Sequence, residues 1–149
     1  MTTPEARELL ANAGLSNIDI VIGDATIITF AGGTSQRYGW SGDITQQTMI
    51  DAGLYNGSSW IKEPQTVELG PAVTSIGSNA FRGCTSLSGV TIPDSVTSVG
   101  NGVFSKTNIT NITIPDSVTN IGEFTFNQCS SLTSVTIGNG VTSIGDLAF

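Results

Sequence analysis

Residues 90–100 read Val90-Thr-Ile-Pro-Asp-Ser-Val-Thr-Ser-Val-Gly, and three near-copies of this phrase occur in the same half of the chain. The copies begin at Val67, Ile112 and Val135, so that successive copies start 23, 22 and 23 residues apart. A repeat length in the twenties is typical of a solenoid, in which each unit buries its apolar face against the next. Solenoids of this kind mostly bind other molecules, so the repeat predicts a binding surface.

Each repeat carries the pattern of two short strands. Alternating apolar residues, such as Val90 and Ile92, predict the first strand. Pro93-Asp94 predicts a turn, because proline fixes φ and the aspartate side chain supports the turn. The second strand, at 96–99, ends at Gly100, which allows a tight corner. A phenylalanine then follows in every repeat, and we expect the four rings to stack as the main apolar column. The four are Phe81, Phe104, Phe126 and Phe149.

Residues 1–66 lack the repeat and are predicted to form a small α+β capping unit. A proline at the first helical position and a short apolar stripe predict a helix at 4–13. A glycine turn between two apolar runs predicts a hairpin of strands 18–22 and 25–30, and 36–40 returns as a third strand. Such a unit would cover the open edge of the first repeat, which would otherwise invite pairing with other strands.

A second helix is expected in the same unit. Asp43 is the expected N-cap residue, with Gln46 at the reciprocal position of a capping box. Met49 belongs to the apolar side of this helix, and Gly53 is expected to end it as a left-handed cap. Residues 55–66 are then expected to form a loop that leads into the repeats.

The phrase Ile-Pro-Asp-Ser-Val-Thr-Ser-Val-Gly, followed by Phe, Cys and Leu, resembles the BspA-type, treponemal subclass of leucine-rich repeats over residues 67–149. The resemblance implies an α/β fold: a leucine-rich-repeat solenoid of about four β-rich coils of 22–23 residues, the last one incomplete, behind the α+β cap. It also implies a bacterial protein of the cell surface or a secreted one, which adheres to host proteins and to other cells.

The two cysteines, Cys84 and Cys129, occupy the same repeat position two units apart. At about 4.8 Å per coil they would lie roughly 10 Å apart, beyond the Cα separation of about 7 Å that a disulfide tolerates. We expect buried free thiols that pack as small hydrophobic side chains, and a disulfide is the less favoured alternative. The shorter repeat between them has Lys106 and Thr107 near this position.

The composition argues against nucleic-acid binding and against catalysis. The chain of 149 residues has a formal net charge of −7, and it has no basic patch that could neutralise phosphates. It contains no histidine, and neither a phosphate-binding loop nor a Cys-x-x-Cys motif occurs. The acidic residues are scattered, so an acid–base pair of carboxylates is a weak alternative. We therefore expect no enzyme, no cofactor and no nucleic-acid partner.

The sequence leaves the location of the protein open. No run of about 18 apolar residues, which could span a membrane, occurs, and residues 1–8 lack the features of a signal peptide. Three locations are compatible with this: the cytoplasm, a virus-like particle released by lysis, or the exterior after removal of a signal. The family resemblance favours the cell surface or secretion.

Stacked carboxylates raise the question of a metal site. Asp94 and Asp116 should lie one coil apart, about 4.8 Å, and two carboxylates could contribute to a calcium site, which needs six to eight oxygen ligands. The equivalent residues in the flanking repeats are Pro71 and Asn139. Turn formation explains both aspartates, so we expect no metal.

Threonines between the inward aliphatic residues mark a candidate binding face. Its predicted members are Thr91, Thr113, Thr136 and, at the equivalent position of the first repeat, Glu68. A flat array of threonines is similar to the surface of ice-binding solenoids. The simpler explanation is that threonine suits the exposed side of a strand and makes good cross-strand neighbours. A second set is expected to face outward from the second strands: Thr74, Thr97, Thr119 and Thr142.

The tryptophans and tyrosines all lie before the repeats. Aromatic anchors dominate the binding energy of many interfaces, so an exposed member of this set is a candidate anchor, although a role in the core of the cap is favoured. The set is Tyr38, Trp40, Tyr55 and Trp60.

The last repeat stops at Phe149, and an uncovered end would expose aliphatic residues and strand edges. The candidate residues for self-association at this end are Val135, Ile137, Ile144 and Phe149. Two functions follow: a non-catalytic binding module that adheres to a protein or glycan surface, or a structural assembly module, as in a phage-like particle or scaffold. Pairing of the last repeats would give a homodimer.

Overall fold

The computed structural model describes residues 25–149, which form a β-rich solenoid of about three turns with repeats of about 23 residues. The prediction of a leucine-rich-repeat solenoid is confirmed. In the described part of the chain there is one short helix, α2 (Gln46–Asp51). The helix expected at 4–13 and the strand expected at 18–22 lie outside the described residues.

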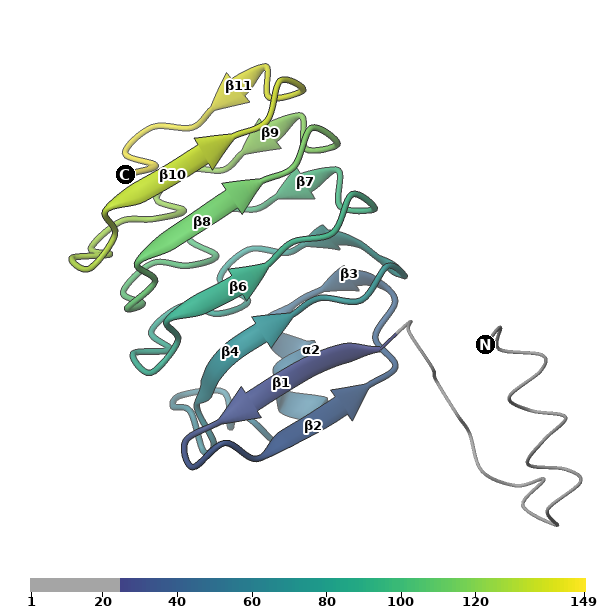
Figure 1. Ribbon diagram of the computed structural model, residues 1–149. Coiled ribbons are helices and arrows are strands. Elements are labelled where there is room, and N and C mark those ends of the chain that lie inside the picture. Colours follow the sequence, from purple (N-terminus) through teal and green to yellow (C-terminus); the bar gives the residue numbers. More distant parts are fainter. Residues whose placement is uncertain (1–24) are drawn as a thin grey trace, which may run out of the picture.

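One side of the solenoid is a front layer of longer strands (Figure 1). Four of them form one sheet in the order β2-β1-β4-β6, and β8 and β10 pair beside it. Their bounds are β1 (Thr26–Phe30), β2 (Ser35–Tyr38), β4 (Pro64–Glu68), β6 (Gly89–Thr91), β8 (Asn111–Ile114) and β10 (Ser134–Ile137). Apolar residues alternate with polar ones along these strands, so one face of the layer packs on the core and the other meets solvent.

The opposite side is a rear sheet of five parallel strands, in the order β11-β9-β7-β5-β3. Their bounds are β3 (Gly42–Ile44), β5 (Val73–Ile76), β7 (Ser98–Val99), β9 (Asn120–Ile121) and β11 (Ser143–Ile144). The three in the later repeats are only two residues long, shorter than the expected 96–99. In each repeat a Pro-Asp or glycine turn joins the front strand to the rear one; the N–H of Val96, for example, donates to the carbonyl of Pro93 at 3.1 Å.

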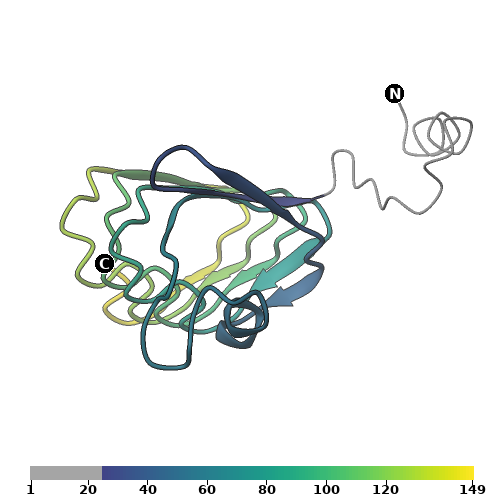
Figure 2. The ribbon, with the colours of Figure 1, turned by 90° about the horizontal axis from the view of Figure 1, so that it is seen from below.

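The coils close through a third side, the turn side, made of residues 78–83, 101–106 and 123–128 (Figure 2). These residues are not strands, yet each coil still hydrogen-bonds to the next. The N–H of Gly83 donates to the carbonyl of Ser105 at 2.9 Å. One coil later, the backbone N–H of Lys106 donates to the carbonyl of Asn127 at 2.9 Å. The turn side therefore has a backbone ladder of its own, which satisfies polar groups that stacking buries.

The core contains the predicted column of phenylalanine rings. Phe81, Phe104 and Phe126 are almost fully buried, and neighbouring ring centroids lie 5.9 and 5.7 Å apart. Phe149 extends the stack at 5.3 Å from Phe126 but is 55% exposed. Equivalent residues stack because each coil has nearly the same length, so the column is a direct consequence of the repeat period.

The N-terminal strands continue the solenoid, although they lack its repeat. β1 pairs antiparallel with both β2 and β4, and β3 adds to the rear sheet, where Ile44 is paired with Ile76. Strand β4 begins at Pro64, because Pro64 pairs with Phe30, so the loop expected at 55–66 is three residues too long. The predicted boundary between residues 66 and 67 falls within β4.

The expected N-cap at Asp43 is wrong. Asp43 lies in β3, where its carboxylate accepts a 2.8 Å hydrogen bond from the hydroxyl of Ser75. The N-cap is Thr45, which forms a reciprocal capping box with Thr48. Gln46 is the first helical residue and has no capping role. The rear-sheet pairing extends as far as Ile44, so the chain cannot turn into a helix earlier. The predicted helix end is confirmed, with Gly53 at φ 70°.

Candidate functional site

The solvent face of the front layer presents two rows of side chains that cross the strands. Strand register and the repeat define both rows. The first row is Arg37, Ile27, Glu68, Thr91, Thr113 and Thr136. The second row is Ser35, Thr29, Thr66, Gly89, Asn111 and Ser134. The structure therefore brings together the four residues of the predicted binding face, and all four are exposed.

The threonine hydroxyls of the front layer differ from those of the rear sheet. On the rear side, Thr97 donates its hydroxyl to the carbonyl of Thr74 at 3.3 Å, and Thr142 donates to Thr119 at 3.1 Å. No such bond to another described residue is recorded for the side chain of Thr113 or for its neighbours in the row. The rear hydroxyls thus reinforce the backbone ladder, whereas the threonine hydroxyls of the first row remain available to a ligand. In the second row, the hydroxyls of Thr29 and Ser35 bond each other at 2.9 Å.

The second row contains a hollow at Gly89. It has a volume of about 260 Å³ and is lined by Thr66, Val67, Glu68, Gly89, Val90, Thr91 and Asn111. The hollow exists because glycine stands where the other repeats have a threonine, an asparagine or a serine. A Cβ at Gly89 would meet only the Cγ2 of Thr66, at 3.7 Å, so a larger side chain would fit there.

The front layer also has a break beside this hollow. The backbone N–H of Asn108 donates to the carbonyl of Leu87 at 3.0 Å, and the backbone N–H of Thr110 donates to the carbonyl of Ser88 at 3.4 Å. Beyond these bonds, no strand ladder joins β6 to β8 among the described residues. The stretch between Phe104 and Ile112 is one residue shorter than in the neighbouring repeats and leads directly into β8. Sequence reasoning missed Gly89 and Asn111 as site residues, although the short repeat was a visible signal.

Charge is sparse on this surface. The exposed charged residues of the two rows are Arg37 and Glu68, which lie toward the N-terminal strands. Strands β6, β8 and β10 contain no charged residue. A neutral surface of hydroxyls and amides forms hydrogen bonds without the high cost of desolvating ions.

The four predicted aromatic anchors are all half-buried and pack against the core cluster. Tyr38 and Trp40 stack with ring centroids 4.8 Å apart, and Tyr55 lies 5.3 Å from Trp60. The pKa of Tyr38 is raised above its usual value by burial. The indole of Trp60 donates a 3.1 Å hydrogen bond to the carbonyl of Arg82. The structure thus places these residues over the first coil, and their use as binding anchors stays a prediction.

The C-terminal edge of the last coil is apolar. Ile137 is 40% exposed and Ile144 47% exposed, while Val135 is half-buried. A depression of about 330 Å³ at this edge lies between Phe126 and Phe149 and includes Val135 in its lining. The four residues predicted for self-association therefore share one edge of the solenoid.

Both cysteines are free. Cys84 is fully buried, and burial, with a smaller contribution from the carboxylate of Glu63, raises the pKa of its thiol well above the usual range. In the shorter repeat, Thr107 occupies the equivalent place: its hydroxyl donates to the carbonyl of Phe104 at 2.8 Å and lies 3.5 Å from the Sγ of Cys129. A hydroxyl replaces a thiol here because a nearby carbonyl accepts its hydrogen bond.

The turn aspartates support the backbone. The carboxylate of Asp116 accepts a 2.7 Å hydrogen bond from the N–H of Asn139 in the next coil, and Asp94 is exposed. Within residues 25–149, no group of three or more His, Cys, Asp or Glu side chains could hold a metal ion. No helix in this part of the chain is long and apolar enough to cross a membrane.

Residues 50–149 match the family described as the BspA type leucine rich repeat region. The chain belongs to the BspA-type leucine-rich repeat family. The match begins inside α2, before the first phrase that the repeat pattern identifies, which agrees with β4 being a strand of the solenoid. No curated protein matches the chain.

Several solved structures are similar to this BspA-type chain. The pneumococcal vaccine antigen PcpA has a TM-score of 0.54 and 15% identity, over 84% of this chain and 39% of that chain. A leucine-rich repeat protein from Bacteroides ovatus is 25% identical over 57% of this chain and 34% of that chain, with a TM-score of 0.40. A leucine rich cell surface protein from Faecalibacterium prausnitzii is 24% identical over 90% of this chain and 46% of that chain, with a TM-score of 0.44. The chain spans less than half the length of each, and the likeness to PcpA shows the fold alone.

Proposed function

We propose that this protein is a non-catalytic binding module that adheres to a protein or glycan through the front layer. The observation that carries this proposal is the double row of exposed, mostly uncharged side chains, rich in hydroxyls, around the hollow at Gly89, where Glu68 contributes one carboxylate. Strands place such groups about 4.8 Å apart on a rigid surface. A rigid array loses little conformational entropy on binding, which leaves more of the interaction energy as affinity.

The family supports this proposal. Two of the similar proteins are a vaccine antigen and a cell surface protein, which is compatible with an adhesive role outside the cell. The absence of histidine from the sequence and the scarcity of charge on the front layer support a non-catalytic role, because general acid–base chemistry needs positioned titratable groups. We retain the treponemal subclass as a finer prediction.

The test uses an array of immobilised glycans and a panel of host extracellular-matrix proteins. Gly89→Thr fills the hollow, and Thr113→Lys adds a bulky charge to the first row. Thr74→Lys is the matched control, because Thr74 is also an exposed strand threonine but lies in the rear sheet. We expect both front-layer variants to lose binding and the control to keep it. Equal binding by all three would overturn the proposal.

A second candidate function is assembly through the last coil, and the exposed apolar edge at Ile137, Ile144 and Phe149 favours it. The proposed partner is a second copy of this chain, since identical edges can pair about a two-fold axis. Light scattering after size-exclusion chromatography would detect the dimer, and Ile144→Lys should dissociate it. A monomer at every concentration would rule this candidate out.

A further inference from the structure

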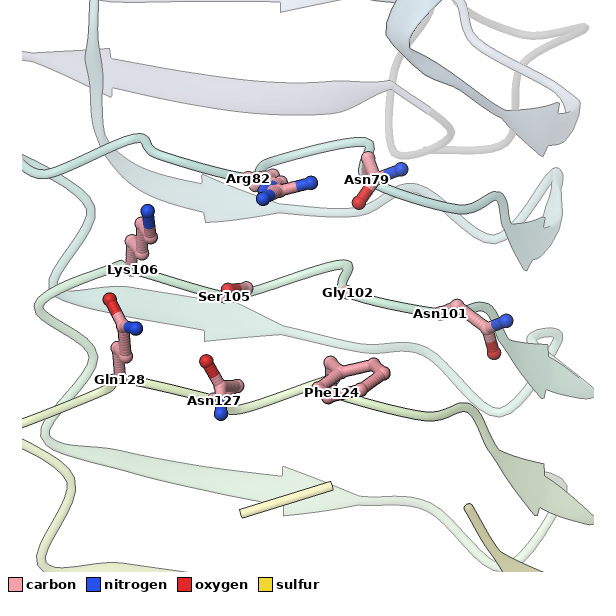
Figure 3. Close-up of a pocket in the computed structure, with 9 residues that line it drawn as sticks. All are labelled: Asn79, Arg82, Asn101, Gly102, Ser105, Lys106, Phe124, Asn127 and Gln128. Atoms are coloured by element: carbon pink, nitrogen blue, oxygen red, sulfur yellow. The ribbon is translucent and has the colours of Figure 1, made fainter. Parts of the chain in front are cut away.

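We infer that the turn side carries a second binding site, which accepts a carboxylated sugar such as a uronic or sialic acid residue. The site is a hollow of about 350 Å³ lined by Asn79, Arg82, Asn101, Gly102, Ser105, Lys106, Phe124, Asn127 and Gln128 (Figure 3). It belongs to a different side of the solenoid from the front layer, and the inference does not depend on the proposed function.

The hollow arises from small residues in the middle coil. Gly102 stands at the position occupied by Asn79 in the coil before it and by Phe124 in the coil after it. In the same way, Ser105 stands between Arg82 and Asn127. Two small side chains with larger ones on both sides leave a depression on an otherwise regular surface. Figure 3 shows Gly102 and Ser105 in the middle coil with the larger side chains on the coils around them.

Two cations border the hollow. Arg82 and Lys106 are exposed and are the only basic residues in 67–149. No ion pair is recorded for either of them within the described part of the chain. The protein as a whole is acidic, with a net charge of −7, so two neighbouring unpaired cations are a local exception. They suit one carboxylate, because an anion gains most from charge-assisted hydrogen bonds.

Amides and a ring complete the chemistry. No side-chain hydrogen bond to another described residue is recorded for Asn79, Asn127 or Gln128, so their amides can donate to and accept from sugar hydroxyls. Phe124 is 42% exposed, and an exposed ring can cover the apolar C–H face of a sugar. Cations, amides and an aromatic face in one depression match an acidic sugar better than a neutral one.

The repeat places Phe124 in an unusual backbone conformation. Its φ is 55°, in the left-handed region, where a bulky side chain is costly. The repeat imposes this conformation at the position, and the first two coils fill it with Asn79 and Gly102, residue types that tolerate it well. The last coil also has an exposed bulky residue in this conformation, Leu147, so the conformation belongs to the repeat. What Phe124 adds is an exposed aromatic ring at the edge of the hollow.

The experiment titrates the protein with N-acetylneuraminic acid, glucuronic acid, their methyl esters and a sulfated monosaccharide, followed by amide chemical shifts. We expect shifts centred on Asn101, Gly102 and Ser105 with the two carboxylated sugars. The methyl esters should bind about tenfold or more weakly, because they lose the charge-assisted bonds. Binding of the sulfated sugar alone would assign the site to sulfate instead and overturn the carboxylate preference.

Two variants test the residues. Gly102→Asn fills the hollow with the residue type that the preceding coil has at nearly the same φ, 60° at Asn79 against 62° at Gly102, so the fold should persist. A Cβ there would meet the Oδ1 of Asn79 at 2.6 Å, and the displaced amide would fill the hollow further. Phe124→Asn should weaken sugar binding without lowering the melting temperature, because asparagine relieves the left-handed strain.

The front-layer variant Thr113→Lys separates this site from the proposed function, since it should leave binding of the carboxylated sugar unchanged. The inference is wrong if no amide near Gly102 shifts at tens of millimolar sugar, or if Gly102→Asn binds as the unmodified protein does. Binding of acidic peptides in place of sugars at this hollow would also contradict it.

Discussion

The indole Nε1 of Trp60 lies 3.1 Å from the carbonyl oxygen of Arg82, to which it donates a hydrogen bond. In the next coil the equivalent carbonyl is that of Ser105, and it accepts from the N–H of Gly83 at 2.9 Å. Trp60 therefore takes the place that a backbone N–H of a preceding coil would have. A side chain outside the strict repeats thus satisfies one of the carbonyls that the turn-side ladder leaves open in the first coil.

The first prediction concerns this cap. Trp60→Phe keeps an aromatic ring against Tyr55 but removes the donor, so it should lower the free energy of unfolding by about 1 kcal/mol. That corresponds to a fall of roughly 2–4 °C in the melting temperature of a chain of this size. Thermal unfolding followed by circular dichroism would measure it. An unchanged melting temperature would mean that water satisfies the Arg82 carbonyl equally well.

The second prediction concerns the corner glycines. A Cβ at Gly122 would overlap the backbone of Gly100 and Asn101, so a side chain at this corner would force the two coils apart. Gly122→Ala should destabilise the fold by about 1–3 kcal/mol through overpacking. Gly89→Ala is the matched control, because its Cβ has only an ordinary contact at 3.7 Å. Urea denaturation of both variants should separate them; equal stabilities would contradict the close packing.

The third prediction concerns the ring column. Phe104 is fully buried between two rings, whereas Phe149 is 55% exposed at the edge. Phe104→Ala should cost about 3–5 kcal/mol, the usual range for a buried phenylalanine. Phe149→Ala should cost much less, since half of its ring already meets solvent. Similar losses in urea denaturation would show that the last coil is covered in solution.

The fourth prediction concerns pH. Because burial raises the pKa of the Cys84 thiol in the folded protein, the unfolded chain loses this proton at a lower pH than the folded one. Below the unfolded thiol pKa of about 8.5 the contribution to stability is fully present. Above it, stability should fall by up to about 1.4 kcal/mol per pH unit. Burial also raises the pKa of Tyr38, and its effect begins only above about pH 10.

Denaturation between pH 7 and pH 10 would measure this slope. Cys84→Val removes the thiol while keeping an apolar side chain of similar size. It should therefore abolish the fall in the free energy of unfolding between about pH 8.5 and 10, the range in which the unfolded thiol loses its proton. Cys129→Ala is the control and should leave it in place. If Cys84→Val showed the same pH dependence, another group would be responsible.

Much of the candidate surface could be predicted from the pattern of the repeats. Thr91, Thr113 and Thr136 were expected to face solvent because they alternate with aliphatic residues, and they do. The hollow at Gly89 and the break between β6 and β8 were not expected. The hollow depends on the missing side chain at Gly89, and the point where strand pairing stops appears only when the coils are stacked.

The sequence by itself determined the coil, its two strands, its turn and the column of rings. With a nearly constant period, each residue meets its own equivalent in the next coil, so local pattern and tertiary contact coincide. Tertiary structure alone decided the cap at Thr45, the antiparallel pairing of β1 with β4 and the bond from Trp60 to Arg82. The strand pairing and the indole bond join residues about 20–40 positions apart, and no repeat relates these residues to each other. The cap at Thr45 follows from how far the rear sheet extends. In all three cases long-range contacts had to override local preference.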